Sequence, residues 1–285
     1  MIILGVAASA RFGVDGQTDA FFFSPTYQQD PATAEPMGLL QLCSFQGEIL
    51  REGQHAAPPK WEGPAGVGNP VVAFPYWAGL AASAQFGVPN QTDVFAVSTE
   101  GQLMVAWVDG ALTWGGPMGI GGTGVFPAGA PVAASAQFGV PNQTDVFSVS
   151  TEGQLMVAAV QEAGEWAPPM GIGGAGVFPQ RAALAASAQF GVPNQTDVFA
   201  VSNEGQLMVA WVDGAGKWAG PAVIGNVSTS GGGYGLAASA QFDLIGPPNR
   251  TDVFIQTGQQ ILVTWVDGAG KWTLPGPIAT FPALG

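Results

Sequence analysis

The stretch "SAQFGVPNQTDVF" occupies residues 83–95 and decides the fold. The same thirteen residues return at 135–147 and at 187–199, and looser copies begin at Ser9 ("SARFGVDGQTDAF") and Ser239 ("SAQFDLIGPPNRTDVF"). From residue 83 onwards the copies start every 52 residues, and the first copy precedes the second by 74. Internal repeats of this length are typical of solenoids and propellers, in which each repeat forms one structural unit.

One repeat predicts four strands. Residues 80–86 predict an innermost strand, 93–99 a second, 102–108 a third and 114–121 an outer one. Pro and Asn in "GVPNQT" suit the first connection, "EG" suits a tight hairpin, and the proline of the fourth segment favours a sheet edge. Both faces of 102–108 are apolar, as a sheet between two other sheets requires. Four antiparallel strands per repeat, without a helical period, describe a propeller blade.

We therefore predict an all-β protein, a five-bladed β-propeller of four-stranded antiparallel blades that forms a single domain over residues 1–285. The innermost segments are rich in Ala and Ser, which suits five strands that converge on a narrow axis. The blades are expected at about 1–72, 73–126, 127–178, 179–230 and 231–285. The first repeat is irregular: its second to fourth strands are predicted at 19–24, 39–45 and 60–68, with a polar, Pro-rich excursion at 25–37.

Composition excludes several classes of partner. The net charge is −13 with only 7 Lys and Arg residues, which argues against nucleic acid and against anionic membrane surfaces. No apolar run approaches the roughly 18–20 residues of a membrane-spanning helix. The single cysteine excludes an internal disulfide framework. The first residues, "MIILGVAASARFG", lack the basic segment of a signal peptide, so we expect a cytoplasmic protein or one secreted without a recognisable signal.

Motifs for catalysis, cofactors and metals are weak. The only histidine, His55, lies in a predicted loop, and no zinc or EF-hand spacing occurs. The segments "GIGGTG" (119–124) and "GIGGAG" (171–176) match a dinucleotide-binding pattern, but no helix follows them to receive a phosphate. "NQT" at Asn90 matches a glycosylation sequon and is interpreted as a turn. We expect no cofactor and no metal.

The repeated aspartates argue against an enzyme. Five-bladed propeller glycosidases place one pair of carboxylates in a central funnel, and such a site requires blades that differ. In this chain the aspartates recur at equivalent places instead, at Asp93, Asp145, Asp197 and Asp252. We expect each of them to accept backbone N–H hydrogen bonds and so to close the loop before it.

Repeated polar and aromatic residues predict carbohydrate sites on one rim. Sugars need an aromatic surface for their C–H face and amides or carboxylates for their hydroxyls. The candidate carbohydrate-binding residues are Asn90, Gln91, Trp107, Asp109 and Trp114 in the second repeat, Asn194, Gln195, Trp211, Asp213 and Trp218 in the fourth, and Asn249, Arg250, Trp265, Asp267 and Trp272 in the fifth. The third repeat has Ala159 and Gln161 in place of the first Trp and the Asp.

Packing between blades is the alternative role for one set of tryptophans. A Trp occurs at one place in every repeat, at Trp61, Trp114, Trp166, Trp218 and Trp272. A Trp at one place in every repeat is more often a packing residue between blades than a binding residue. Trp107, Trp211 and Trp265 vary among the repeats, and they are therefore the better binding candidates.

Residues 197–225, "DVFAVSNEGQLMVAWVDGAGKWAGPAVIG", resemble a blade of the bacterial β-propeller lectins related to the Photorhabdus fucose-binding lectins. The five-blade count is similar to that of tachylectin-2, a propeller that binds N-acetylhexosamines. The resemblance implies a multivalent lectin for glycans or glycoconjugates, with fucose or N-acetylglucosamine as candidate sugars, no cofactor and a possible oligomer. Prolines stand where that family often has a second aromatic residue, at Pro117, Pro169, Pro221 and Pro275. The open alternatives are a protein-interaction scaffold and a glycoside hydrolase.

Overall fold

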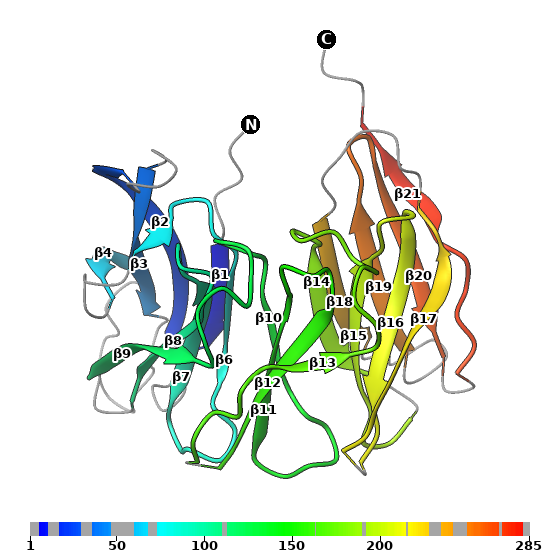
Figure 1. Cartoon of the computed structure of the whole chain (residues 1–285), viewed down its shortest axis with the longest axis horizontal. Coiled ribbons are helices and arrows are strands. Elements are labelled where there is room, and N and C mark those ends of the chain that lie inside the picture. The colour runs from blue at the N-terminus through cyan, green and yellow to red at the C-terminus, as the bar shows by residue number, and fades with distance from the viewer. Residues whose placement is uncertain are drawn as a thin grey trace, which may run out of the picture. The chain divides into compact units, whose positions relative to one another are not determined.

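The computed structural model of the chain describes residues 6–10, 17–29, 36–46, 60–67, 73–109, 113–162, 164–189, 192–214, 216–227, 235–241, 250–267 and 270–281. Over these residues the regular structure is entirely β, and the strands form five antiparallel sheets (Figure 1). No helix that could cross a membrane occurs in the described parts of the chain. The fold is a five-bladed β-propeller, as predicted, and each sheet is one blade.

The four strands of each blade follow one another in the chain and pair in that order. The innermost strands are β1 (Val6–Ala10), β6 (Leu80–Ala84), β10 (Ala133–Ala136), β14 (Leu184–Ala188) and β18 (Gly235–Gln241). The second strands are β2 (Gln17–Gln29), β7 (Thr92–Val97), β11 (Gln143–Val149), β15 (Thr196–Val201) and β19 (Arg250–Gln256). The third strands are β3 (Pro36–Gln46), β8 (Leu103–Val108), β12 (Leu155–Gln161), β16 (Gln206–Val212) and β20 (Gln260–Val266). The outer strands are β4 (Lys60–Gly66), β9 (Trp114–Ile120), β13 (Met170–Ile172), β17 (Trp218–Asn226) and β21 (Gly276–Thr280).

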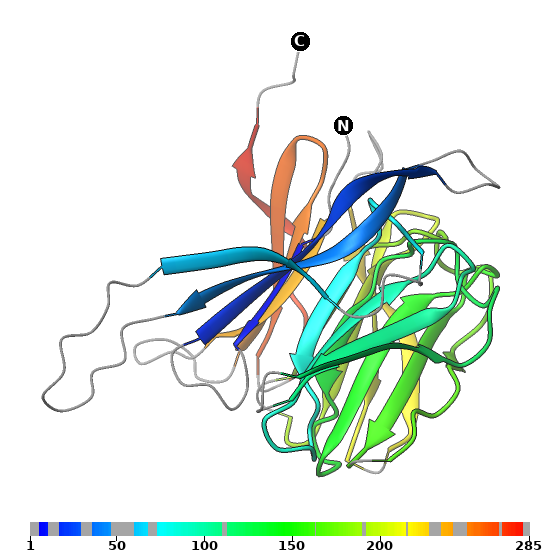
Figure 2. The same ribbon diagram turned by 90° about the vertical axis from the view of Figure 1, so that its left-hand side faces the viewer.

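In blade 2 the predicted strands agree with these bounds within two residues. Blades 1 and 3 depart from the pattern. In blade 1, β2 and β3 run on into the Pro-rich excursion, so part of the predicted loop is a lengthened hairpin (Figure 2). Pairing resumes there after an irregularity between Pro25 and Gln29, and a short extra strand, β5 (Phe74–Pro75), pairs with β3. In blade 3, β13 has three residues because Pro168 and Pro169 carry no N–H to donate to the ladder.

Close contacts divide the chain into two compact units, Met1–Val132 with Val160–Pro168, and Ala133–Ala159 with Pro169–Gly285. In the first unit the innermost strands β1 and β6 lie side by side. In the second, β14 lies between β10 and β18. Small side chains allow this approach, since these strands consist mainly of Ala and Ser.

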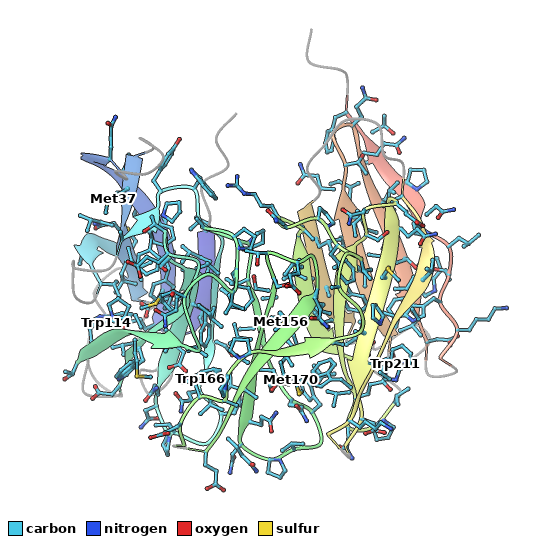
Figure 3. All side chains as sticks on the ribbon, viewed as in Figure 1. Met37, Trp114, Met156, Trp166, Met170 and Trp211 are labelled. Carbon is cyan, nitrogen blue, oxygen red and sulfur yellow. The ribbon has the colours of Figure 1, made fainter. Side chains whose placement is uncertain are left out.

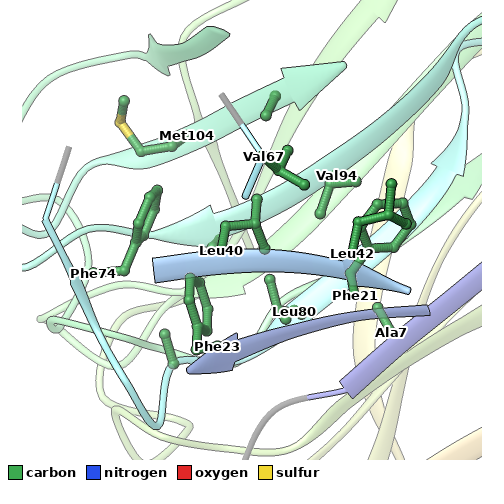
Figure 4. Close-up of a cluster of buried hydrophobic side chains, with 13 residues drawn as sticks. Ala7, Phe21, Phe23, Leu40, Leu42, Val67, Phe74, Leu80, Val94 and Met104 are labelled. Atoms are coloured by element: carbon green, nitrogen blue, oxygen red, sulfur yellow. The ribbon is translucent and has the colours of Figure 1, made fainter. Parts of the chain in front are cut away.

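Each unit buries apolar side chains between neighbouring blades. In the first unit, Phe21, Phe23 and Leu40 of blade 1 pack against Val94 and Met104 of blade 2 (Figure 4). In the second unit one cluster joins blades 3 and 4 and another joins blades 4 and 5. A fully buried Phe or Leu contributes about 1.5–3 kcal/mol, so these clusters are the main source of cohesion between blades.

The recurring Trp of each outer strand region packs against a buried Phe of the preceding blade. The four described pairs are edge-to-face, with interplanar angles of 76–78°. Their ring centroids are 6.0 Å apart for Phe21–Trp114, 5.4 Å for Phe95–Trp166, 5.4 Å for Phe147–Trp218 and 5.5 Å for Phe199–Trp272. The packing role that the sequence offered as an alternative is therefore present in all four. The side chain of Trp61 lies outside the described residues.

Candidate functional site

The register of blade 2 decides which predicted site residues share a face. Residues that pair directly across antiparallel strands point to the same side of a sheet, and successive residues alternate. Asp93 pairs with Trp107, and Trp107 pairs with Gly115. Trp114 pairs with Val108, the residue after Trp107, and so points to the opposite face. The two tryptophans predicted for one site of this blade therefore lie on different sides of it.

The same division holds in blades 4 and 5. Trp211 pairs with Asp197 whereas Trp218 pairs with Val212, and in blade 5 Trp265 pairs with Asp252 whereas Trp272 pairs with Val266. The outer-strand Trp points back to the preceding blade, where it meets the buried Phe. The structure thus does not bring together the two tryptophans that the sequence grouped within each repeat.

Trp107 is grouped instead with a tryptophan from the next repeat. Phe95 lies two residues after Asp93, on the same face of β7, and its ring contacts Trp166. Figure 3 labels Trp166. Trp166 belongs to the segment 160–168, which is part of the first unit with blade 2. Trp107 and Trp166 are both half-buried. We call Gln91, Asp93, Trp107 and Trp166 the Trp107 site.

An equivalent arrangement occurs between blades 4 and 5. Trp211 of blade 4 and Trp272 of blade 5 are half-buried and pack against the same buried cluster, which includes Phe199 and Val253. Trp211 shares its face with Asp197, and Gln195 lies two residues before that aspartate. We call Gln195, Asp197, Trp211 and Trp272 the Trp211 site. Between blades 3 and 4, Ala159 stands where a Trp would complete the pair with Trp218.

The repeated aspartates are held by a neighbouring side chain. In blade 2 the Nε2 of Gln91 donates to Oδ1 of Asp93 over 2.8 Å and to Oε1 of Gln85 over 2.7 Å. The same bonds recur from Gln143 to Asp145 and Gln137, and from Gln195 to Asp197 and Gln189. In blade 1 Gln17 donates to Asp19 over 3.0 Å.

The expectation that these aspartates accept backbone N–H groups was wrong for blades 2 to 4. The physical reason is the period of the strand: side chains two residues apart share a face, so the Gln amide reaches the carboxylate directly. Gln91 and Gln195 were predicted to bind sugar, but their side-chain NH₂ groups donate hydrogen bonds within the protein, to Asp93 and Asp197 respectively. In blade 2 the network crosses to the next repeat, because Nε2 of Gln85 donates to the carbonyl of Glu162 over 3.1 Å.

Half of each of these carboxyl groups has no partner. The Oδ2 atoms of Asp93, Asp145 and Asp197 are buried and accept no hydrogen bond within the described structure. Burial disfavours the charged form and raises the pKa of each group from 3.8 to about 7, although the hydrogen bond from Gln opposes part of that rise. Burial thus favours the protonated, neutral form of these carboxyls.

In blade 5 the repeated aspartate forms an ion pair instead of a hydrogen bond with Gln. Arg250 stands where the other blades have Gln, and its Nε and Nη2 donate to Oδ1 and Oδ2 of Asp252 over 2.6 and 3.2 Å. The guanidinium carbon lies 4.7 Å from the ring centroid of Trp265, a cation–π distance. Both carboxyl oxygens are paired here, and the guanidinium covers part of the Trp265 indole.

The remaining predicted site residues shape the rim turns. Asn90 and Asn194 are exposed and adopt left-handed φ values of 64° and 63°, as expected for turn residues. Asp109 Oδ1 accepts from the backbone N–H of Thr113 over 3.0 Å. The carbonyls of Asp213 and Asp267 accept backbone bonds of 2.9 Å across their turns, from Gly216 and Gly270 respectively. Asn249 and His55 lie outside the described residues.

Sequence reasoning missed Gln85 and Glu162, and it did not predict that Arg250 pairs with Asp252. The signal for Arg250 was present: a Gln or Arg stands two residues before each repeated Asp, the spacing that places two side chains on one face. The hydrogen bond from Gln85 to Glu162 joins two repeats, and no local sequence pattern predicts it. Within the described residues no three His, Cys, Asp or Glu side chains gather in a way that would hold a metal ion.

Comparison with known proteins identifies the family. The BP39L lectin from Burkholderia pseudomallei has a structure similar to this chain, with 45% sequence identity and a TM-score of 0.80 over 98% of this chain and 71% of the lectin. The chain belongs to the family of this lectin. The lectin resemblance of residues 197–225 is thereby confirmed. No protein-family model matches the chain, and no curated protein sequence does.

More distant similarity extends to fungal lectins. The Aleuria aurantia lectin, described as a six-bladed β-propeller with a novel fucose recognition mode, matches at 16% identity and a TM-score of 0.60 over 99% of this chain and 83% of its own. A mutant of that lectin in complex with α-methyl-L-fucoside matches at 17% identity and a TM-score of 0.59, over 99% and 82%. At such identities the likeness shows a shared propeller fold. The BP39L-family chain described here has five blades where the fungal lectin has six.

Proposed function

We propose that this BP39L-family protein is a multivalent lectin whose sugar sites lie at blade interfaces. The observation that carries the proposal is that half-buried tryptophans from consecutive repeats lie on one blade face, Trp107 and Trp166 on blade 2 and Trp211 and Trp272 on blade 4. An indole that is partly exposed offers an apolar surface for the C–H face of a pyranose. The 45% identity with a lectin supports carbohydrate as the ligand class.

The binding tryptophan is held rigidly. In blade 2 the indole of Trp107 lies against Gly115 of the outer strand, so closely that a Cβ at that position would collide with the ring. Trp166, which precedes β13, is fixed by its edge-to-face contact with Phe95. Rigid aromatic side chains lose little conformational entropy when a ligand binds, so a smaller part of the binding free energy is lost to ordering the site.

The proposed sites differ in completeness. The Trp107 and Trp211 sites each have both tryptophans, whereas the interface of blades 3 and 4 has Ala159 instead of one. In blade 5 the Arg250 guanidinium stacks on Trp265 and changes the chemistry that this indole presents. We therefore infer at least two sugar sites per chain.

Several weak sites on one protein give a higher apparent affinity than one site alone. One shallow sugar site contributes about 4–6 kcal/mol, which corresponds to millimolar to tens-of-micromolar affinity. Several such sites on one rigid protein raise the apparent affinity for a glycan-covered surface by roughly 10²–10⁴ where the geometry allows simultaneous contact. Fucosides are the first sugars to test, because the Aleuria aurantia lectin of similar fold was solved in complex with them.

The test is a glycan array with the labelled protein, followed by calorimetry with each sugar that binds. We expect at least two sites per chain, with Trp107→Ala and Trp211→Ala each removing one of them. Phe86→Ala, a change at an exposed aromatic residue outside both sites, controls for general loss of surface apolar area. Absence of binding to every glycan would overturn the proposal and favour the protein-interaction scaffold.

A further inference from the structure

The Trp107 and Trp211 sites are alike in their buried parts and differ in charge at the turn beside the second tryptophan. The turn that leads to Trp166 reads "QEAGEW" (161–166) and carries Glu162 and Glu165, with no cation. The corresponding turn of blade 5 reads "DGAGKW" (267–272) and carries one acid and one base. Glu162 and Glu165 are exposed, as are Asp267 and Lys271.

Glu162 is held at the interface with blade 2. Its carbonyl accepts the 3.1 Å hydrogen bond from Gln85, so its backbone is tied to the loop of the neighbouring blade. It adopts a left-handed φ of 55°, where blades 4 and 5 have glycine, at Gly214 and Gly268. In the second unit the Cα of Gly214 borders the equivalent loop, at Gly139. The position thus faces the preceding blade in both units.

The Trp107 site also contains a buried carboxyl group, that of Asp93. Asp93 is fully buried, stands beside Trp107 in the ladder and points to the same face, with its Oδ2 unpartnered within the described residues. The Trp107 site therefore has two indoles and a buried carboxyl on one face of blade 2, and the turn that ends at Trp166 carries two exposed carboxylates. This set attracts an organic cation, because an ammonium group is stabilised both by the face of an indole and by nearby negative charge. The net charge of −13 extends the attraction to longer range.

We propose that the Trp107 site prefers saccharides that carry a free, protonated amino group over their N-acetylated forms, and that the Trp211 site lacks this preference. The inference rests on the proposed lectin function and names the ligand class of one of its sites. Glu162 and Glu165 are the specificity-determining residues, and Trp107 and Trp166 supply the aromatic surface common to both sites. Lys271 disfavours an ammonium group at the Trp211 site.

The experiment isolates each site and compares one sugar with its acetylated form. Calorimetry or ligand-detected NMR is performed with methyl glucosaminide and methyl N-acetylglucosaminide, in Trp211→Ala protein to observe the Trp107 site and in Trp107→Ala protein to observe the Trp211 site. We expect the ratio of affinities, amino over acetylated, to be about three- to tenfold higher at the Trp107 site in 20 mM salt. In about 0.5 M salt the ratio at the Trp107 site should fall to the ratio at the Trp211 site, because salt screens exposed charges.

Charge exchange provides the matched variants. Glu162→Gly with Glu165→Lys removes both acidic side chains of the blade 3 turn and places Gly and Lys where blades 4 and 5 have them, and we expect it to abolish the higher ratio. Lys271→Glu in the Trp107→Ala background should raise the ratio at the Trp211 site. Glu165→Gln, a milder change, should give an intermediate ratio if the double variant folds poorly by thermal melting.

The outcomes separate this inference from the function on which it rests. If neutral sugars bind at both sites and the ratio is the same at both, or is insensitive to the Glu162 and Glu165 changes, the inference is wrong and the lectin function stands. If neither neutral nor amino sugars bind the unmodified protein, the lectin function itself fails, and this inference fails with it.

Discussion

Replacing Asp145 by Asn tests the buried carboxyls of blades 2 to 4. Asp145 is fully buried, its Oδ1 accepts a 2.8 Å hydrogen bond from Gln143, and burial raises its pKa from 3.8 to about 7. The folded protein therefore holds this proton more tightly than the unfolded chain does. The stability that the protonated group contributes is fully present below about pH 4 and is lost as the pH rises to about 7.

The magnitude follows from the size of the shift. A rise of about three pKa units corresponds to at most about 4 kcal/mol of stability lost between pH 4 and pH 8, at 1.36 kcal/mol for each unit. Asn keeps the acceptor for Gln143 but buries an amide NH₂ where Oδ2 stood, which costs about 1–3 kcal/mol at every pH. Asp145→Asn should therefore destabilise the protein by about 1–3 kcal/mol near pH 4.5. At pH 8 the same change should stabilise it by about 1–3 kcal/mol.

The assay is urea unfolding of the unmodified protein and the Asp145→Asn variant at pH 4.5, 6 and 8. Glu152→Gln, in an exposed turn of the same blade, serves as the matched control for removing one negative charge. The informative quantity is the difference in unfolding free energy between variant and unmodified protein, followed across pH. If that difference changes by less than about 0.5 kcal/mol between pH 4.5 and 8, the reasoning from burial is refuted, since ordinary surface substitutions have effects of that size.

Three further changes test other parts of the structure. Arg250→Gln should destabilise the protein by about 1–3 kcal/mol in urea unfolding, because Asp252 loses its charge-assisted bonds; an unchanged midpoint would show that the ion pair contributes nothing. Phe199→Ala should cost about 3–5 kcal/mol and loosen Trp272, seen as a shift of tryptophan fluorescence to longer wavelength; a loss below 1 kcal/mol would contradict the packing role. Ala159→Trp should add one sugar site per chain in calorimetry, and an unchanged stoichiometry would count against the paired-tryptophan model.

Strand positions were predictable because their signals are local. Alternation with period two and the turn residues of each repeat are read within a few residues, and the described strands of blade 2 end within two residues of their predicted bounds. The failures have local causes as well. Pro168 and Pro169 shorten one outer strand, and the blade 1 hairpin extends through a polar segment that the composition marked as a loop.

The candidate site was predicted in composition but not in grouping. Trp107, Trp211 and Gln91 were singled out from the sequence. In the structure Trp107 pairs with Asp93 across the strands and Gln91 bonds to it along its own strand, all on one face. The role of Asp93 was misjudged, because the sequence does not reveal whether a carboxylate will meet a backbone amide or a side-chain amide. A same-face neighbour two residues away decided it.

The sequence by itself determined the number of blades, the strands within each blade and the class of fold, since all of these follow from a repeat whose turns and apolar alternation are encoded locally. The tertiary structure alone decided which tryptophans act together. A side chain on the face of a blade meets a side chain of the next repeat, and near-identical repeats make pairing within a repeat and pairing between repeats indistinguishable in sequence. Only the strand register and the order of the blades place Trp107 with Trp166, and Trp211 with Trp272.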